Sequence, residues 1–291
     1  MILLDGKKTS SDIKDEITLE VSQLKKEGKK TPHLAAVIVG NDGASKTYVG
    51  AKVKACNRVG FLSTLVELSK ETSEASLLSK IEELNNDDDI DGFIVQLPLP
   101  KHIDEQKILM AVNPDKDVDG FHPTNVGKMA LNLPTFISAT PFGILELLDR
   151  YNVQTSGKQV VVIGRSHIVG SPMSILLSQK RKVGNATVTI THSRTKNLKE
   201  ITLQADIVIA ALGIPEFLTA DMVKDNVTVI DVGITRVEDT TKKSGYRLLG
   251  DVSFEEVSKK SAFITPVPGG VGPMTIAMLL KNTLLAAKSR N

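Results

Sequence analysis

The sequence predicts an α/β protein of two domains, with parallel sheets flanked by helices. Short apolar runs rich in β-branched residues recur along the chain, and helical or turn segments separate them. The chain has 291 residues, 41% of them hydrophobic, which is enough for two cores of ordinary size. Prolines in "LNLPTFISATPFG" interrupt the alternation once, so we place a domain boundary there.

The first part of the chain alternates between helices and strands. A helix is predicted over Ser10 to Lys26, because Ile13, Ile17 and Val21 recur at helical spacing. The run "HLAAVIVG" is apolar at nearly every position, which is typical of a parallel strand buried on both faces. Further strands are expected at 64–68 and 92–96, and further helices at 44–59, 74–84 and 105–112.

The second part has the pattern of a dinucleotide-binding unit. A helix over 142–151 comes first, followed by the four apolar runs "QVVVIG", "ATVTIT", "ADIVIAALG" and "VTVIDVGI". A last helix is predicted over 276–287, and its pattern allows packing on either domain.

Composition argues against several classes of protein. The net charge is +2, and 36 basic residues are spread among 34 acidic ones, so nucleic acid is not an expected partner. The single cysteine, Cys56, allows no internal disulfide, and no paired Cys/His spacing suggests a metal site. No signal peptide and no apolar stretch of about 20 residues is present, so we expect no membrane partner and a cytoplasmic location.

The stretch "VVVIGRSHIVGSP" predicts a strand, a glycine turn and a helix. Gly164 and Gly170 match the outer glycines of a G-x-G-x-x-G turn, with Ser166 in place of the middle one. Pro172 suits the first position of the following helix, whose N-terminal N–H groups would then face a phosphate. The two glycines alone are equally compatible with a turn that binds nothing.

The next strand end, "TITHSRT", favours NADP over NAD. It offers Ser193 and Arg194 where an NAD site has a carboxylate, and Arg165 adds a second cation from the glycine turn. The alternative is that both arginines are ordinary solvated charges.

Polar residues of the first part suggest a second site. Tyr48 and Lys52 are one helical turn apart, and Gln96 follows the strand in "GFIVQLPLP". The alternatives are a solvated helix face for Tyr48 and Lys52 and a strand-end cap for Gln96. In "NPDKDVDGFHP", Asp115 and Asp117 are interpreted as solvated carboxylates and His122 as a turn histidine.

Taken together, these segments resemble the bifunctional methylenetetrahydrofolate dehydrogenase/methenyltetrahydrofolate cyclohydrolase family over nearly the whole chain. The resemblance is carried, in the family's order, by "YVGAKVKAC", "DGFIVQLPLP", "PDKDVDGFHPTNVG", "GRSHIVGSP" and "TPVPGGVGPMT". It implies oxidation of 5,10-methylenetetrahydrofolate with NADP⁺ and hydrolysis of the methenyl product to 10-formyltetrahydrofolate.

The resemblance also implies roles for residues at the matching positions. Lys52 is the expected central catalytic residue, with Gln96 beside it and Tyr48 packed on the folate ring. Asp119 is expected to hydrogen bond the pterin. The other substrate-binding and cofactor-binding positions are Pro268 and Gly269, and Gly164, Arg165, Ser166, Ser193 and Ile234, with Ser193 near the 2′-phosphate and Ile234 near the nicotinamide.

The domains implied are a folate domain over 1–138, completed by a C-terminal helix at 270–291, and a Rossmann-like NADP domain over 139–269. A cleft between them and a homodimer are implied as well. Ala139 replaces the cysteine usual in the family, so a thiol there is not essential, and "SQKRKVGNATVT" is longer than usual. Alternative functions are an NADP-dependent dehydrogenase of another small substrate and a non-catalytic NADP-binding module.

Overall fold

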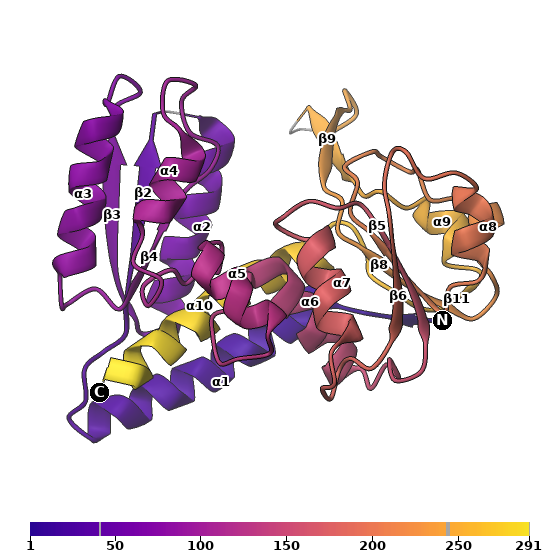
Figure 1. Ribbon diagram of the computed structural model, residues 1–291, viewed down its shortest axis with the longest axis horizontal. Helices are drawn as coiled ribbons and strands as arrows, with labels where there is room; N and C mark the ends of the chain where they lie inside the picture. Colours follow the sequence, from indigo (N-terminus) through magenta and orange to yellow (C-terminus); the bar gives the residue numbers. More distant parts are fainter. Residues whose placement is uncertain (41, 243–244, 291) are drawn as a thin grey trace. The chain divides into compact units, whose positions relative to one another are not determined.

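The structure is a computed structural model that describes residues 1–40, 42–242 and 245–290 (Figure 1). It divides into two compact units, each named for its main sheet. The three-stranded unit comprises Ser11–Ala139 and Ile276–Asn291, and the six-stranded unit comprises Met1–Ser10 and Thr140–Thr275. Within the described residues, no helix combines the length and the apolar character needed to cross a membrane.

The three-stranded unit is a parallel sheet in the order β3-β2-β4. Residues of β2 are buried at all positions after His33, as its apolar run predicts. Helices α3 and α4 cover one face of the sheet, where Leu77 and Ile108 pack with Val37 and Phe93. The elements of this unit, some shared with the other, are α1 (Gly6–Lys26), β2 (His33–Val39), α2 (Gly43–Val59), β3 (Leu62–Leu68), α3 (Glu74–Asn86), β4 (Gly92–Val95), α4 (Glu105–Ala111), α5 (Pro123–Ala130) and α10 (Val271–Arg290).

The six-stranded unit is a wholly parallel sheet in the order β1-β11-β8-β7-β5-β6. Strands β6 and β7 lie on opposite sides of β5, so the strand order reverses at β5. In such sheets ligands bind beyond the carboxyl ends of the strands at the point of reversal. A separate hairpin, β9–β10, is antiparallel. The elements are β1 (Ile2–Leu3), α6 (Ala139–Arg150), β5 (Gln159–Ile163), α7 (Gly170–Ser178), β6 (Thr187–Thr191), α8 (Leu198–Leu203), β7 (Ile207–Ala210), the 3₁₀ helix η1 (Ala220–Met222), β8 (Val227–Asp231), β9 (Thr235–Glu238), β10 (Tyr246–Leu249), α9 (Phe254–Val257) and β11 (Ser261–Ile264).

The core of this unit forms where apolar residues of four strands meet the helices α8 and α9. Val161, Val208 and Val229 lie in one buried cluster with Val257, and Ile201 packs against it. The first residues of the chain join the same sheet, because β1 pairs with β11 and the Leu4 amide donates to the Ile264 carbonyl at 2.8 Å.

The α/β fold with parallel sheets is confirmed, and the sequence patterns predicted its longer elements within a few residues. The division of the chain into a folate-binding domain and a cofactor-binding domain stays a prediction. The sequence analysis did not identify β1, α5, β11 or the β9–β10 hairpin. Each of these is short, and β1 and β9–β10 carry exposed residues, so the hydrophobic periodicity is too weak to indicate them.

Cys56 is expected to be unreactive in the folded protein. It lies fully buried on α2, and this burial raises the pKa of its thiol to about 12. Since the thiolate is the nucleophile, a disulfide reagent at pH 8 should modify no cysteine until denaturant is added. Rapid modification of the native protein would show that α2 opens locally.

Candidate functional site

Lys52 and Gln96 meet in the three-stranded unit. The Lys52 ammonium donates to the Gln96 side-chain oxygen at 3.1 Å, and the Gln96 side-chain amide donates to the Leu97 carbonyl at 2.7 Å. Both side chains are half-buried. Gln96 directly follows β4, so the pair lies at the carboxyl end of that strand, where ligands bind in parallel sheets. Gln96 therefore contacts Lys52 in addition to the backbone, whereas the alternative interpretation gave it only the role of a strand-end cap.

Helix α2 sets the position of Lys52. Asp42 caps the helix, accepting from the Ser45 amide at 2.8 Å, and Gly60 ends it in the left-handed conformation. Val49 and Cys56 face inward and are buried, which fixes the rotation of the helix. Tyr48, one turn before Lys52, keeps 48% of its surface exposed, so its ring is available for contact with a ligand.

Asp119 is placed at the same end of β4. The segment before it runs parallel to β4, with Asp117 opposite Phe93, so Asp119 lies level with the end of the strand. Burial raises the pKa of the Asp119 carboxyl, the positive charge of Lys52 lowers it, and the negative charge of Asp117 raises it. The structure thus brings Lys52, Gln96 and Asp119 to one edge of the sheet.

The glycine turn in the six-stranded unit has the geometry of a close backbone approach. Gly164 has φ +119°, and a Cβ on it would overlap the Ala211 carbonyl oxygen. A Cβ on Gly170 would overlap the Gly164 carbonyl oxygen. The Ser166 hydroxyl accepts from the Val169 and Gly170 amides at 3.1 and 3.4 Å, so the serine at the middle position closes the turn.

Pro172 does not occupy the first helical position that the sequence predicts. Helix α7 begins at Gly170, which makes Pro172 its third residue. The position is still in the first turn, where a missing N–H leaves no helical bond unmade. The prediction was wrong by two residues because the second glycine itself starts the helix.

The arginine-bearing loop lies beside the glycine turn. Strands β5 and β6 are adjacent, and the Gly164 amide donates to the Thr191 carbonyl at 2.9 Å. After β6, the Thr195 amide donates to the His192 carbonyl at 2.8 Å, which forms a tight turn and leaves Ser193 and Arg194 exposed. Arg165 is exposed as well. Two cations and a hydroxyl therefore flank one carboxyl edge.

Ile234 and a buried carboxylate network complete that edge. Ile234 follows β8 and is 48% exposed. Just before it, Asp231 accepts from the amides of Gly233, Asp251 and Val252, and burial raises its pKa to about 7. Asp251 accepts from the Leu212 and Gly213 amides through one carboxylate oxygen.

These two aspartates were missed by the sequence analysis. The signal was present in "DVG" and "GDV", since Gly233 and Gly250 each lie within two residues of an aspartate, and a Cβ on either glycine would overlap a carboxylate oxygen. They hold the loops after β7 and β8, and so fix the backbone of the candidate cofactor site.

Pro268 and Gly269 belong to the six-stranded unit, after β11. Pro268 is exposed, and Gly269 has φ +109° and accepts from the Lys7 amide at 2.8 Å. Each unit thus carries part of the predicted set of site residues. No group of three or more His, Cys, Asp or Glu residues suited to a metal ion occurs in the ranges the structure describes.

The structure changes the interpretation of two residues near Asp119, namely Asp117 and His122. Asp115 is exposed as expected, but Asp117 is buried with 5% exposure and accepts two hydrogen bonds, so it is not a solvated turn carboxylate. His122 is a turn histidine with a defined role, because its Nδ1 accepts from the Thr124 amide and caps α5.

A glycine turn on a parallel sheet, together with a lysine–glutamine pair at another strand end, is the arrangement expected of an α/β dinucleotide-binding enzyme. Two family models match: "Tetrahydrofolate dehydrogenase/cyclohydrolase, catalytic domain" over residues 4–119, and the NAD(P)-binding domain of the same name over 138–291. The chain belongs to the tetrahydrofolate dehydrogenase/cyclohydrolase family.

Similar proteins cover the whole chain. "Bifunctional protein FolD" of Flavobacterium johnsoniae is 70% identical over 291 residues, covering 100% of this chain and 99% of the relative. A crystal structure of the bifunctional FolD enzyme of Campylobacter jejuni has 48% identity and a TM-score of 0.93, with both chains covered completely. The Trypanosoma brucei enzyme, described as complexed with NADP cofactor and inhibitor, has 39% identity and a TM-score of 0.93, covering 99% of this chain and 98% of that one.

Proposed function

We propose that this chain oxidises 5,10-methylenetetrahydrofolate with NADP⁺ and hydrolyses the methenyl product to 10-formyltetrahydrofolate, with Lys52 as the central catalytic residue. The activities follow from family membership and from the bifunctional relatives. The observation that supports the residue assignment is the 3.1 Å contact between Lys52 and Gln96 at a strand end. The family models and the bifunctional relatives favour this function over the two alternatives, a dehydrogenase of another substrate and a silent binding module.

The residues of the glycine turn fit NADP. Gly164 and Gly170 have no room for side chains because other backbone atoms occupy those positions, so the turn packs tightly against the start of α7, where helix N–H groups can bind a pyrophosphate. Arg165 follows β5 and Ser193 follows the adjacent strand β6, and both are exposed. These two side chains would hold the 2′-phosphate. Ser166 would bind in the turn, and the backbone at Ile234 would adjoin the nicotinamide. When bound, NADP⁺ supplies the hydride acceptor of the first reaction.

The second reaction needs a base. Water adds to the methenyl carbon, the bond from that carbon to N5 breaks, and one proton is released overall. A lysine side chain accepts a proton only as the neutral amine, which is the form that a general base needs. Gln96 offers an oxygen at 3.1 Å that orients the amine through its remaining N–H bonds.

The other side chains bind and orient folate. The exposed Tyr48 ring packs on the flat pterin, and the Asp119 carboxylate accepts hydrogen bonds from pterin N–H groups. Pro268 and Gly269 contribute from the loop after β11. Positioning of this kind accounts for most of the protein's contribution to hydride transfer.

The domain assignment, the assembly and the location belong to the same proposal. Folate would bind residues 1–138 and 270–291, and NADP residues 139–269. We also propose a homodimer in the cytoplasm with no nucleic-acid partner. Light scattering of the purified chain tests the dimer, since a monomeric mass at assay concentration would contradict it.

The assay mixes purified protein with 5,10-methylenetetrahydrofolate and NADP⁺ or NAD⁺, and follows reduced cofactor and methenyl absorbance together. We expect reduction with little accumulation of methenyl product, and faster reduction with NADP⁺ than with NAD⁺. No reduction with either cofactor would reject the dehydrogenase assignment, and accumulation of all the methenyl product would reject the cyclohydrolase assignment.

A further inference from the structure

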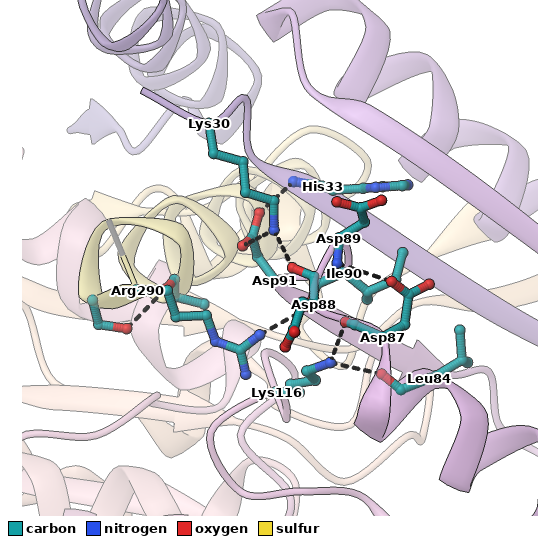
Figure 2. A network of polar contacts seen from close by, with 12 residues as sticks. Lys30, His33, Leu84, Asp87, Asp88, Asp89, Ile90, Asp91, Lys116 and Arg290 are labelled. Carbon is teal, nitrogen blue, oxygen red and sulfur yellow. Dashed lines mark hydrogen bonds and ion pairs between the residues drawn. The ribbon is translucent and has the colours of Figure 1, made fainter. Parts of the chain in front are cut away.

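The segment that carries Asp119 is held at its amino-terminal end by a buried lysine. Lys116 is 1% exposed, and its ammonium donates to the Leu84 carbonyl at 2.8 Å and the Asp87 carbonyl at 2.6 Å, at the end of α3 (Figure 2). The Lys116 carbonyl in turn accepts from the Phe93 amide at 2.9 Å, which fixes the segment against β4. A buried ammonium with these partners acts as a structural anchor.

Asp117 holds the other end of the segment. One oxygen of its carboxylate accepts from the His122 amide at 2.8 Å and from the Asn125 side-chain amide at 2.9 Å. Asn125 is 2% exposed and also donates to the Pro114 carbonyl at 2.9 Å. The carboxylate therefore joins the chain before Asp119 to the chain after it and to helix α5.

The turn between these contacts leaves Asp119 little freedom. Gly120 follows it with φ +73°, and a Cβ on Gly120 would meet the Ser138 amide nitrogen at 2.7 Å. The Gly120 amide donates to the Asp117 carbonyl at 3.1 Å. On the other side, the Asn282 side-chain amide of α10 donates to the Val118 carbonyl at 2.8 Å. Asp119 sits between fixed neighbours on both sides.

Two charges act on the Asp119 carboxyl besides its burial. Lys52 on α2 favours its ionised form, and Asp117 disfavours it. Asp117 is thus linked to Asp119 in two separable ways, through the backbone turn and through charge. Lys116 is adjacent to Asp117 in the sequence, but it is not among the charges that act on Asp119.

We propose that Asp117 is a positioning residue for Asp119: it fixes the turn that presents Asp119 to folate, and its negative charge acts on the Asp119 carboxylate. The inference rests on the proposed role of Asp119 in binding the pterin. It assigns a function in folate binding to a buried side chain that would not itself touch the substrate.

The test measures KM and kcat for methylenetetrahydrofolate against pH. Ionised Asp119 accepts the pterin hydrogen bonds, so KM of the wild-type enzyme should rise as pH falls through the raised pKa of Asp119. Asp117→Asn keeps an oxygen that can accept both hydrogen bonds but removes the negative charge. It should therefore leave KM at pH 8 within about threefold and move the rise in KM to lower pH.

Asp117→Ala removes the hydrogen bonds as well and should raise KM at pH 8 by about tenfold or more, with a smaller change in kcat. Asn125→Ala releases the turn while leaving the Asp117 charge, so it should raise KM without moving the pH of the rise. Lys116→Met is the matched control: it weakens the same segment and should lower the melting temperature without moving that pH. All variants are assayed below their melting temperatures.

An unshifted rise in KM for Asp117→Asn, or an effect of Asp117→Ala no larger than that of Lys116→Met, would overturn the inference. Asp119→Asn separates this failure from failure of the underlying role. If Asp119→Asn leaves KM unchanged, the pterin contact itself is rejected. If Asp119→Asn raises KM while the Asp117 variants behave like the control, only the positioning role of Asp117 is rejected.

Discussion

Replacing Lys52 with methionine is expected to abolish cyclohydrolase activity. Methionine keeps much of the length of the side chain but has no amine to accept the proton released when water adds. General-base catalysis typically contributes about 10² to 10⁴ in rate, so hydrolysis of supplied methenyltetrahydrofolate should fall close to the rate in buffer. The measurement is the loss of methenyl absorbance at saturating substrate, corrected for the uncatalysed reaction.

Lys54→Met is the control for this variant. Lys54 lies two residues further along α2 and is exposed, so the change removes the same charge and the same group from another side of the helix. Its activity should match that of the wild-type protein. Unchanged turnover of methenyl substrate by Lys52→Met would refute Lys52 as the catalytic base.

Gly164→Ala should remove most of the dehydrogenase activity. The added methyl group would overlap the Ala211 carbonyl oxygen, and alanine strains the positive φ of +119°. Relieving the overlap displaces the turn between β5 and α7, at a cost of about 1 to 3 kcal/mol, before any loss of phosphate contacts. A drop in NADP⁺ affinity on the order of 100-fold follows, since each 1.4 kcal/mol is about tenfold.

Gly157→Ala separates crowding from backbone strain. Gly157 also has a positive φ, +73°, but no atom lies within 4 Å of the position of its missing Cβ. It should lower the melting temperature and leave NADP⁺ affinity intact, as measured by calorimetric titration. Gly164→Ala should still hydrolyse supplied methenyltetrahydrofolate, which needs no cofactor. Wild-type NADP⁺ affinity in Gly164→Ala would contradict the close-approach role of the turn.

The sequence predicted those parts of the fold in which local pattern and burial agree. The run from His33 to Val39 and the strand before Gly164 are apolar because both faces of their sheets are covered, so periodicity alone identifies them. The two-residue strand β1 has no such pattern. Its pairing depends on β11, some 260 residues away, and nothing in its own sequence specifies that partner.

For the candidate sites, residue type and strand-end position predicted Lys52, Gln96 and the glycine turn. The buried support of these sites was not predictable in the same way. Asp117 has the composition of an exposed acidic turn, and its burial depends on Asn125 and His122 folding over it. Asp231 and Asp251 likewise acquire their roles only when separate loops converge on their carboxylates.

The pairing of β1 with β11 also constrains when the protein can finish folding as it is synthesised. Strand β1 is synthesised some 260 residues before its partner strand, β11 (Ser261–Ile264). The three-stranded unit also depends on a late segment of the chain, because the Asn282 side-chain amide donates to the Val118 and Ile137 carbonyls. Neither unit can complete its native contacts until residues 264 and 282 have been synthesised, so the nascent protein passes through a long interval with incomplete cores, when chaperones have most access to it.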